Sequence, residues 1–230
     1  MIQLLTGFLA AAVHVVTGPD HLAAVTPLAI ENRKKAWNIG LMWGIGHVAG
    51  MLLIGLLYLA FKSMINVEKI SGYSEFLVGF VLIGIGAWAI VKTLGRFHFH
   101  HSHPHYHEKP SPQVHIHRHD HHDETNHTHI HSKSTVQNSI TALLIGTLHG
   151  FAGISHFLLI LPTLALPSVS ESVIYLAGFA AGTISAMIIY AFIMGYIGQK
   201  TANFAYSAAF RNLRIIAGAL AIAVGVWWLF

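Results

Sequence analysis

Histidines are the residues of this chain best suited to do chemistry, and they fall into two groups. Five of the 19 lie inside long apolar segments: His14, His21, His47, His149 and His156. The other fourteen lie between His98 and His131. An ionisable side chain is costly in hydrocarbon, so each of the first five marks a functional site, and repeated imidazoles indicate a metal ion.

The spacing of the deep histidines predicts broken helices. His14 and His21 are seven residues apart, as are His149 and His156. In an unbroken helix this spacing separates two residues by about 10 Å along the axis, too far to share one ion. We therefore expect the helices to break between them. The residues that favour such breaks are Gly18, Pro19, Gly150 and Gly153.

Asp20 is the one acidic residue deep within any predicted span. An isolated carboxylate there would tend to be neutral unless a cation lay beside it, and a divalent ion meets that need. The predicted metal ligands are His14, Asp20, His21, His47, His149 and His156. Two alternatives stay open: His47 can instead hydrogen-bond a backbone carbonyl, and His149 and His156 can orient other ligands rather than bind directly.

Composition places these residues in a membrane protein. Mean hydropathy is +0.58 and only 10% of residues are charged, against about 25% in soluble domains. The chain has no cysteine, which excludes a disulfide framework and a thiolate metal site. Imidazole and carboxylate ligands favour borderline ions such as Ni, Co or Zn.

We expect an all-α membrane protein with six transmembrane helices, the first and fourth of them broken. Lys and Arg are divided eleven to two between the loops on the two sides. This bias predicts a multi-pass protein of the cytoplasmic membrane with both termini outside and the histidine-rich loop in the cytoplasm. The expected spans are 2–30, 37–61, 74–95, 137–166, 172–198 and 209–230.

An internal repeat divides the chain into residues 1–95, a loop at 96–136 and residues 137–230. His14 and His21 match His149 and His156 at an offset of 135 residues, and similar small residues recur at offsets of 136 and 139. Because each unit holds three spans, the second copy would enter the membrane in the opposite sense. Such inverted repeats are typical of transporters that bind substrate at the bilayer midplane.

The loop is a low-complexity tract that we expect to be disordered and to chelate metal loosely. A linker whose histidines bind nothing is the alternative. The accessory metal ligands predicted here are His98, His100, His101, His103, His115, His117, His119, His121 and His122.

The motifs resemble those of the nickel/cobalt transporter superfamily, in particular its six-span urease-accessory and nickel–cobalt efflux members. The resemblance rests on His14-x5-Asp20-His21, on Gly46-His47 and on the His-rich loop. Eight-span uptake permeases of the superfamily have four residues between His and Asp-His, where this chain has five. They also carry an acidic motif in the second half, which is absent here.

These observations predict a secondary transporter of Ni or Co and not an enzyme. No tightly bound cofactor is expected, only the transported ion, with proton coupling through the histidines. Direction stays open. The alternatives are a carrier for Zn or Mn and a non-transporting metal-delivery or sensor protein of the urease or hydrogenase accessory type. The expected partners are the ion and the lipid bilayer, without nucleic acid; a metallochaperone or maturation partner and a homo-oligomer are compatible with this function.

Overall fold

The computed structural model describes residues 1–61, 67–94, 102–107, 113–118, 132–152, 163, 165–202 and 208–230. Its helices are α1 (Ile2–Thr17), α2 (Pro19–Asn32), the 3₁₀ helix η1 (Arg33–Lys35), α3 (Ala36–Phe61), α4 (Val67–Thr93), α5 (Ser132–Phe151), α7 (Val169–Ala202) and α8 (Ala208–Trp227). Two strands, β1 (Ser102–His107) and β2 (Gln113–Arg118), form an antiparallel pair.

Four described stretches are long and apolar enough to cross a membrane: Pro19–Leu57, Gly72–Thr93, Val169–Thr201 and Ala208–Trp227. The first of these stretches changes direction at η1, where Arg33 adopts a φ of 36° that L-residues rarely take. α1 is apolar but has 16 residues, about 24 Å of helix, less than the roughly 30 Å hydrocarbon core. Because several described stretches can cross a membrane, the chain is a multi-pass membrane protein.

Two expected spans differ from the helices found. The expected span at 2–30 is two helices, α1 and α2, because the chain leaves helical geometry at Gly18. The expected span at 137–166 is described as a helix only to Phe151, and α5 is not among the four membrane-length stretches. Its first turns, which begin at Ser132, are polar.

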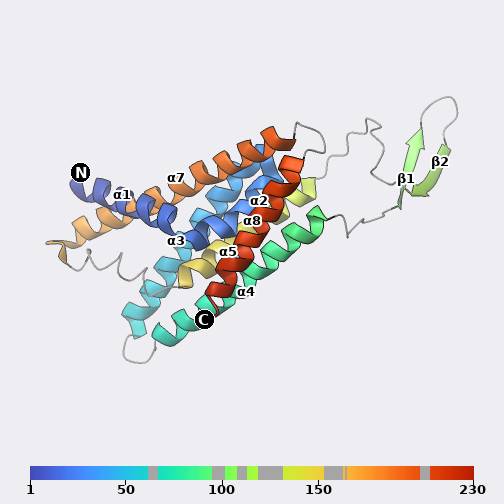
Figure 1. Cartoon of the computed structure of the whole chain (residues 1–230). Helices are drawn as coiled ribbons and strands as arrows, with labels where there is room; N and C mark the ends of the chain where they lie inside the picture. Colours follow the sequence, from blue (N-terminus) through green and yellow to red (C-terminus); the bar gives the residue numbers. More distant parts are fainter. Residues whose placement is uncertain are drawn as a thin grey trace.

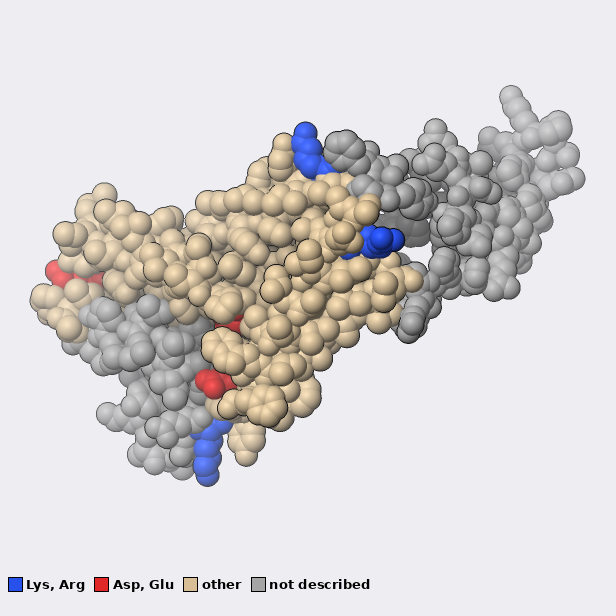
Figure 2. All heavy atoms as spheres, in the orientation of Figure 1, with Lys and Arg blue, Asp and Glu red and all other residues tan. Residues whose placement is uncertain are grey.

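The helices pack as pairs around a buried centre. α3 packs along α5 and α7, while α1 packs along α7 and α4 along α8, and Figure 1 shows the last two pairs side by side. The core between them holds Val15, Ile39, Trp43, Leu82 and Met187. In the view of Figure 2, Lys and Arg lie toward the upper and lower ends of the described surface, and the wide area between them is mostly tan, with a few atoms of Asp or Glu.

Ionic contacts tie several helices together at one end. Glu31 at the end of α2 pairs with Lys92 of α4 at 2.5 Å and with Arg214 of α8 at 3.0 Å. Asn138 of α5 donates a hydrogen bond to Asn32 of α2. These contacts fix the end of α2, and through it the orientation of the residues at the start of the same helix.

The strands lie in the segment for which the sequence predicted disorder. β1 and β2 pair with each other, and Figure 1 shows them beyond the end of α4. Three of the predicted accessory ligands, His103, His115 and His117, are strand residues. The other six, His98, His100, His101, His119, His121 and His122, lie outside the described residues.

Candidate metal centre

The break between α1 and α2 places two site residues at a helix start. Gly18 has an extended conformation (φ −82°, ψ 101°), and Pro19 is the first residue of α2. Proline is well suited to this position because its missing N–H has no partner in the first turn. Asp20 and His21 follow in that turn, where the positive end of the helix dipole favours a carboxylate.

Gly18 also makes room for these side chains. A Cβ added at Gly18 would lie 2.0 Å from Nδ1 of His21 and 2.9 Å from Oδ1 of Asp20. Any other residue at this position would push the imidazole and the carboxylate aside. The break therefore both redirects the chain and allows the site residues to pack against its backbone.

Three histidines from three helices converge beside the break. The candidate ligand atoms of His14 on α1, His21 on α2 and His47 on α3 all lie within 4.8 Å of one another. The ring of His21 is centred 4.7 Å from that of His14 and 5.1 Å from that of His47. His21 and His47 are buried, at 2% and 0% exposure, and His14 is half-buried.

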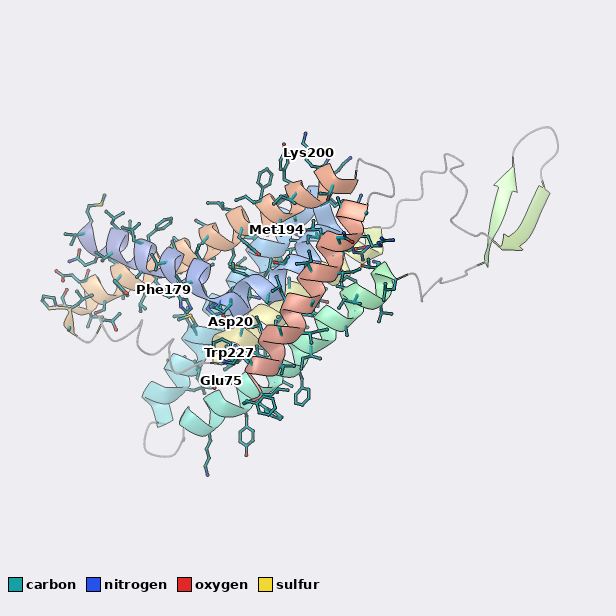
Figure 3. The ribbon with its side chains drawn as sticks, viewed as in Figure 1. Asp20, Glu75, Phe179, Met194, Lys200 and Trp227 are labelled. Carbon is teal, nitrogen blue, oxygen red and sulfur yellow. The ribbon has the colours of Figure 1, made fainter. Side chains whose placement is uncertain are left out.

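Asp20 joins a fourth histidine to this group. His149 of α5 donates a hydrogen bond from Nε2 to Oδ2 of Asp20 at 2.8 Å, and Oδ1 of Asp20 lies 3.3 Å from Nδ1 of His21. Asp20, His21 and His149 again bring their candidate ligand atoms within 4.8 Å. We call His14, Asp20, His21, His47 and His149 the deep cluster; Figure 3 labels Asp20 within the helical body.

Close helix packing sets the distance between His47 and His149. A Cβ on Gly150, next to His149, would lie 2.2 Å from the carbonyl oxygen of His47. A Cβ on Gly46, next to His47, would lie 2.2 Å from the carbonyl oxygen of Leu143. Because only glycine permits such backbone contact, these residues let α3 and α5 approach closely enough to share a site.

Trp43 packs against the deep cluster and was not singled out from the sequence. Its ring stacks on His47 at 4.8 Å with an interplanar angle of 13°, and it lies 5.3 Å from His21 and 5.6 Å from His149. It is fully buried, and within the described part of the chain its Nε1 has no hydrogen-bond partner. The sequence does contain a signal for Trp43: it precedes His47 by one helical turn, which places the two side chains on the same face of the helix.

Five of the six predicted ligands thus come together. The sixth, His156, lies outside the described residues, as does Gly153. α5 remains helical through Gly150 and ends at Phe151, between the two glycines where a break was predicted. The chemistry of the site is that of a buried set of imidazoles with one carboxylate, which suits a borderline divalent ion.

One family of membrane proteins, described as the cytochrome C biogenesis protein transmembrane region, matches residues 4–227. The chain belongs to this family. The chain has no cysteine, and the buried groups described above that could bind a metal ion are imidazoles and a carboxylate.

The chain is similar to three named proteins. It is 34% identical over 197 residues to the chloroplast protein FOR GROWTH AND FERTILITY 2 of Arabidopsis thaliana, covering 83% of the chain and 46% of that protein. It is 43% identical over 86 residues to FOR GROWTH AND FERTILITY 1 of the same plant, covering 37% of the chain and 24% of that protein. The urease accessory protein UreH of Bacillus sp. (strain TB-90) is 27% identical over 199 residues, 85% of the chain and 77% of that protein.

The chain therefore spans less than half the length of either Arabidopsis relative. No solved structure matches it.

Proposed function

We propose that this protein is a secondary carrier that moves a divalent transition-metal ion, nickel or cobalt, across the membrane through the deep cluster. The observation that carries the proposal is the pair of ligand triads that share His21. A purely structural role would not require four imidazoles and a carboxylate, all of them buried except His14, to lie together, since each buried group is costly without a counter-charge or a ligand.

In this proposal His14, His21 and His47 hold the ion. The carboxylate of Asp20 supplies the negative charge that offsets part of the dication's charge, and it orients His21 through Nδ1. His149 holds Asp20 by a hydrogen bond, the arrangement by which a carboxylate and its neighbours commonly fix a metal-binding imidazole. Release of the ion would follow protonation of the imidazoles, which suggests coupling to a proton gradient.

We further propose that the two halves are inverted repeats, and pairs of helix contacts support this. A Cβ on Gly46 of the first half would lie 2.2 Å from the carbonyl oxygen of Leu143 in the second. Gly182 matches Gly46 at an offset of 136 residues, and Leu143 matches Phe8 at an offset of 135. A Cβ on Gly182 would lie 2.4 Å from the carbonyl oxygen of Phe8, so this contact corresponds to the first with the halves exchanged. Exchanging the halves therefore exchanges these two contacts.

The contacts between α4 and α8 behave in the same way. A Cβ on Gly86 would lie 2.3 Å from the carbonyl oxygen of Gly218, and one on Gly225 would lie 2.6 Å from that of Gly79. Gly79 matches Gly218, and Gly86 matches Gly225, at offset 139. A two-fold relation between three-helix units accounts for both pairs, and it would give the carrier two related gates around one site.

The orientation that we propose has both termini outside and the histidine-rich loop in the cytoplasm. The basic residues of η1 lie at the end of α2, where Lys92 and Arg214 meet Glu31. Basic residues from three separate parts of the chain thus gather at the end of the molecule that is assigned to the cytoplasm by the positive-inside rule.

The test is metal flux in proteoliposomes that contain only the purified protein. We expect Ni²⁺ or Co²⁺ to enter vesicles faster than into empty ones, and faster with an imposed pH gradient than without it. Loading the ion inside or outside the vesicles reports the direction, and Zn²⁺ and Mn²⁺ in parallel report the selectivity. Flux that is absent for all four ions would overturn transport, and flux indifferent to the pH gradient would overturn proton coupling alone.

A second function is favoured by one relative, which is named a urease accessory protein. In this alternative the deep cluster binds metal and passes it to a partner without moving it across the membrane. Purified protein would then bind Ni²⁺ in a His21-dependent manner but give no flux into vesicles.

A further inference from the structure

One face of α2 leads from the deep cluster to the other end of the same helix. Along it Asp20, Ala24, Pro27 and Glu31 follow one another at intervals of four, three and four residues. At about 100° per residue these positions lie within roughly 60° of one another around the helix, and Asp20 and Glu31 are about 16 Å apart along its axis. This face therefore joins the carboxylate of the deep cluster to a second acid.

The middle of this face has small side chains and an altered backbone. Ala24 extends only to its Cβ, and Pro27 has no N–H to donate to the carbonyl oxygen of Ala23, one turn earlier. A carbonyl without that donor can contact water or a partly dehydrated cation. The face that carries both acids is therefore also the one on which the helix backbone can serve a passing ion.

Two ion pairs close the far end of this face. Glu31 lies 2.5 Å from Nζ of Lys92, at the end of α4, and 3.0 Å from the guanidinium of Arg214, in α8. α4 and α8 themselves pack side by side (Figure 1). One carboxylate thus ties three helices together, and the two cations leave this end with a net positive charge that repels a dication.

Burial shows that the deep cluster is closed on this side. Every residue of α2 from Ala23 to Ile30 is buried, whereas His14, on α1, is only half-buried. An ion that reached the cluster past His14 would therefore find the way along α2 shut.

α8 contacts both ends of this face. Arg214, near the start of α8, pairs with Glu31, and just beyond the end of α8 the ring of Trp228 lies 5.6 Å from that of His149. α2 likewise carries Glu31 at one end and two residues of the deep cluster at the other. These two helices are the elements through which the deep cluster can bias the ion pairs.

The backbone directly after the ion pairs is strained. Arg33 has a φ of 36°, and strained residues of this kind are found in segments that switch between conformations. The guanidinium of Arg33 lies over the ring of Phe210 in α8, 4.7 Å from the ring centre. Loss of that contact would let the backbone relax, so we expect the hinge that opens this end to lie at Arg33.

We propose that Glu31, Lys92 and Arg214, which we call the ion-pair gate, close one end of a route that the ion takes along α2 between the deep cluster and the cytoplasmic end. The gate rests on the proposed function, because it needs an ion that moves. It is closed in this structure and opens when Glu31 releases its two cations. The side chain of Arg214 is 15% exposed and that of Lys92 is 46% exposed, so water screens the Arg214 pair less and this pair contributes more to closure.

The test uses single thiols, because the chain has no cysteine of its own. Ala24→Cys places a thiol on the route, and Ala29→Cys places one on the opposite face of α2; both alanines are fully buried. Each variant is made in the full chain and placed in sealed vesicles without metal. A membrane-impermeant, positively charged methanethiosulfonate is applied from the side of the histidine-rich loop, and the rate of modification is measured.

We expect Glu31→Gln to speed modification of the thiol in Ala24→Cys roughly tenfold or more, because breaking partly buried ion pairs shifts the population toward the open state. The thiol in Ala29→Cys should stay protected. Arg214→Met should give a larger increase than Lys92→Met. The matched control is Glu171→Gln, the same substitution at the start of α7, which should change neither rate.

Two results would overturn the gate. An unchanged rate for Ala24→Cys in the Glu31→Gln background would mean that the ion pairs do not close the route. Equal acceleration at Ala24→Cys and Ala29→Cys would mean that the ion pairs only hold the helices together, since loosening of the fold exposes both faces of α2.

The gate and the transport proposal fail separately, because the labelling needs no metal. If the gate is wrong, Ni²⁺ flux and its loss in His21→Ala remain. Flux that is absent in vesicles, while Glu31→Gln still exposes the thiol in Ala24→Cys, would overturn transport and leave the gate in control of access to the deep cluster.

Discussion

The deep cluster and the histidine-rich tract, residues 98–131, hold imidazoles in opposite ways. His14 and His149 are 135 residues apart, and helix packing across the whole molecule brings them together. The tract instead places fourteen histidines within 34 consecutive residues of the sequence. The deep cluster draws its residues from four helices and combines its imidazoles with one buried carboxylate, that of Asp20.

This difference separates two tasks. In the deep cluster the surroundings are fixed by packed helices, so burial and geometry can discriminate between ions and control release. For the histidine-rich tract, whose sequence is of low complexity, we expect ion availability and the Irving–Williams order to decide what it binds. We expect changes to the first to affect transport itself, and changes to the second to affect only how the ion is supplied.

The largest effect is expected for His21→Ala. His21 belongs to both ligand triads, so its loss removes a donor from each. We expect metal flux into proteoliposomes to fall roughly 100-fold or more, while Zn²⁺ binding by the histidine-rich tract is unchanged. The control is His127→Ala, the same substitution in the histidine-rich tract. Normal flux in His21→Ala would show that the deep cluster is not the transport site.

A slightly smaller loss is expected for Asp20→Asn, which keeps the shape of the side chain and removes its charge. We expect flux to fall on the order of 10- to 100-fold, because the dication loses its one anionic neighbour in the cluster. Without metal, the variant should unfold at about the same temperature as the original protein, since the Asn oxygen can still accept the hydrogen bond from His149. Ni²⁺ should no longer raise its Tm, whereas Asp120→Asn should respond to Ni²⁺ normally. A Tm increase with Ni²⁺ equal to that of the original protein would remove Asp20 from the site.

Gly150→Ala tests whether close helix packing holds the cluster together. The added methyl would meet the carbonyl oxygen of His47 at 2.2 Å, so α3 and α5 must separate. We expect a loss of about 1–3 kcal/mol in stability and weaker Ni²⁺ binding, measured by thermal unfolding with and without the ion.

The matched control for this substitution is Gly55→Ala. A Cβ at Gly55 of α3 would meet nothing within 4 Å. Replacing a helical glycine in open space should be neutral or stabilising by up to about 1 kcal/mol. Equal losses in both variants would mean that glycine at position 150 is not needed for close approach.

The sequence was sufficient to predict the part of the deep cluster that lies around the break between α1 and α2, because the residues that cause the break are next to the site residues in the chain. Gly18 and Pro19 disfavour a continuous helix, and they lie directly before Asp20 and His21. The same reasoning placed a break at Gly150 and Gly153, and α5 ends at Phe151, between these two positions. The packing role of Gly150 against α3 depends on tertiary contact, so the local sequence did not indicate it.

Other parts of the cluster could not be predicted from local pattern. The hydrogen bond between His149 and Asp20 joins residues 129 positions apart, and the stacking of Trp43 on His47 depends on which face of α3 is turned inward. α3 is apolar on all sides, so its sequence carries no periodic signal for that face. The strands of the loop were missed because the alternating histidines resembled a low-complexity tract without enough apolar residues for a core.

Trp43→Phe is expected to have a modest effect on the deep cluster. Phe preserves an aromatic contact with His47 and His21 but loses part of the stacked area. A change of about 0.5–1.5 kcal/mol in ring packing corresponds to roughly a two- to tenfold weaker ion affinity. The buried indole also supplies a direct readout, since bound Ni²⁺ should quench its fluorescence. Trp37→Phe, on an exposed side chain of the same helix, should leave the Ni²⁺ quenching unchanged. Because the ring of Trp228 also lies 5.6 Å from that of His149, both variants are measured with Trp228→Phe, and quenching that then persists in Trp43→Phe would place the ion elsewhere.

The smallest effect on transport is expected from replacing the fourteen histidines of the histidine-rich tract with Asn. If the tract only supplies or buffers ions, this change should leave the maximal rate of flux unchanged, because no residue of the deep cluster is touched. The rate at low free metal should fall modestly in vesicles where the tract faces the metal solution, and not in vesicles of opposite orientation. A fall in maximal rate comparable to that of Asp20→Asn would mean that the ion must pass through the tract on its way to the deep cluster, and the two groups would then be successive sites on one path.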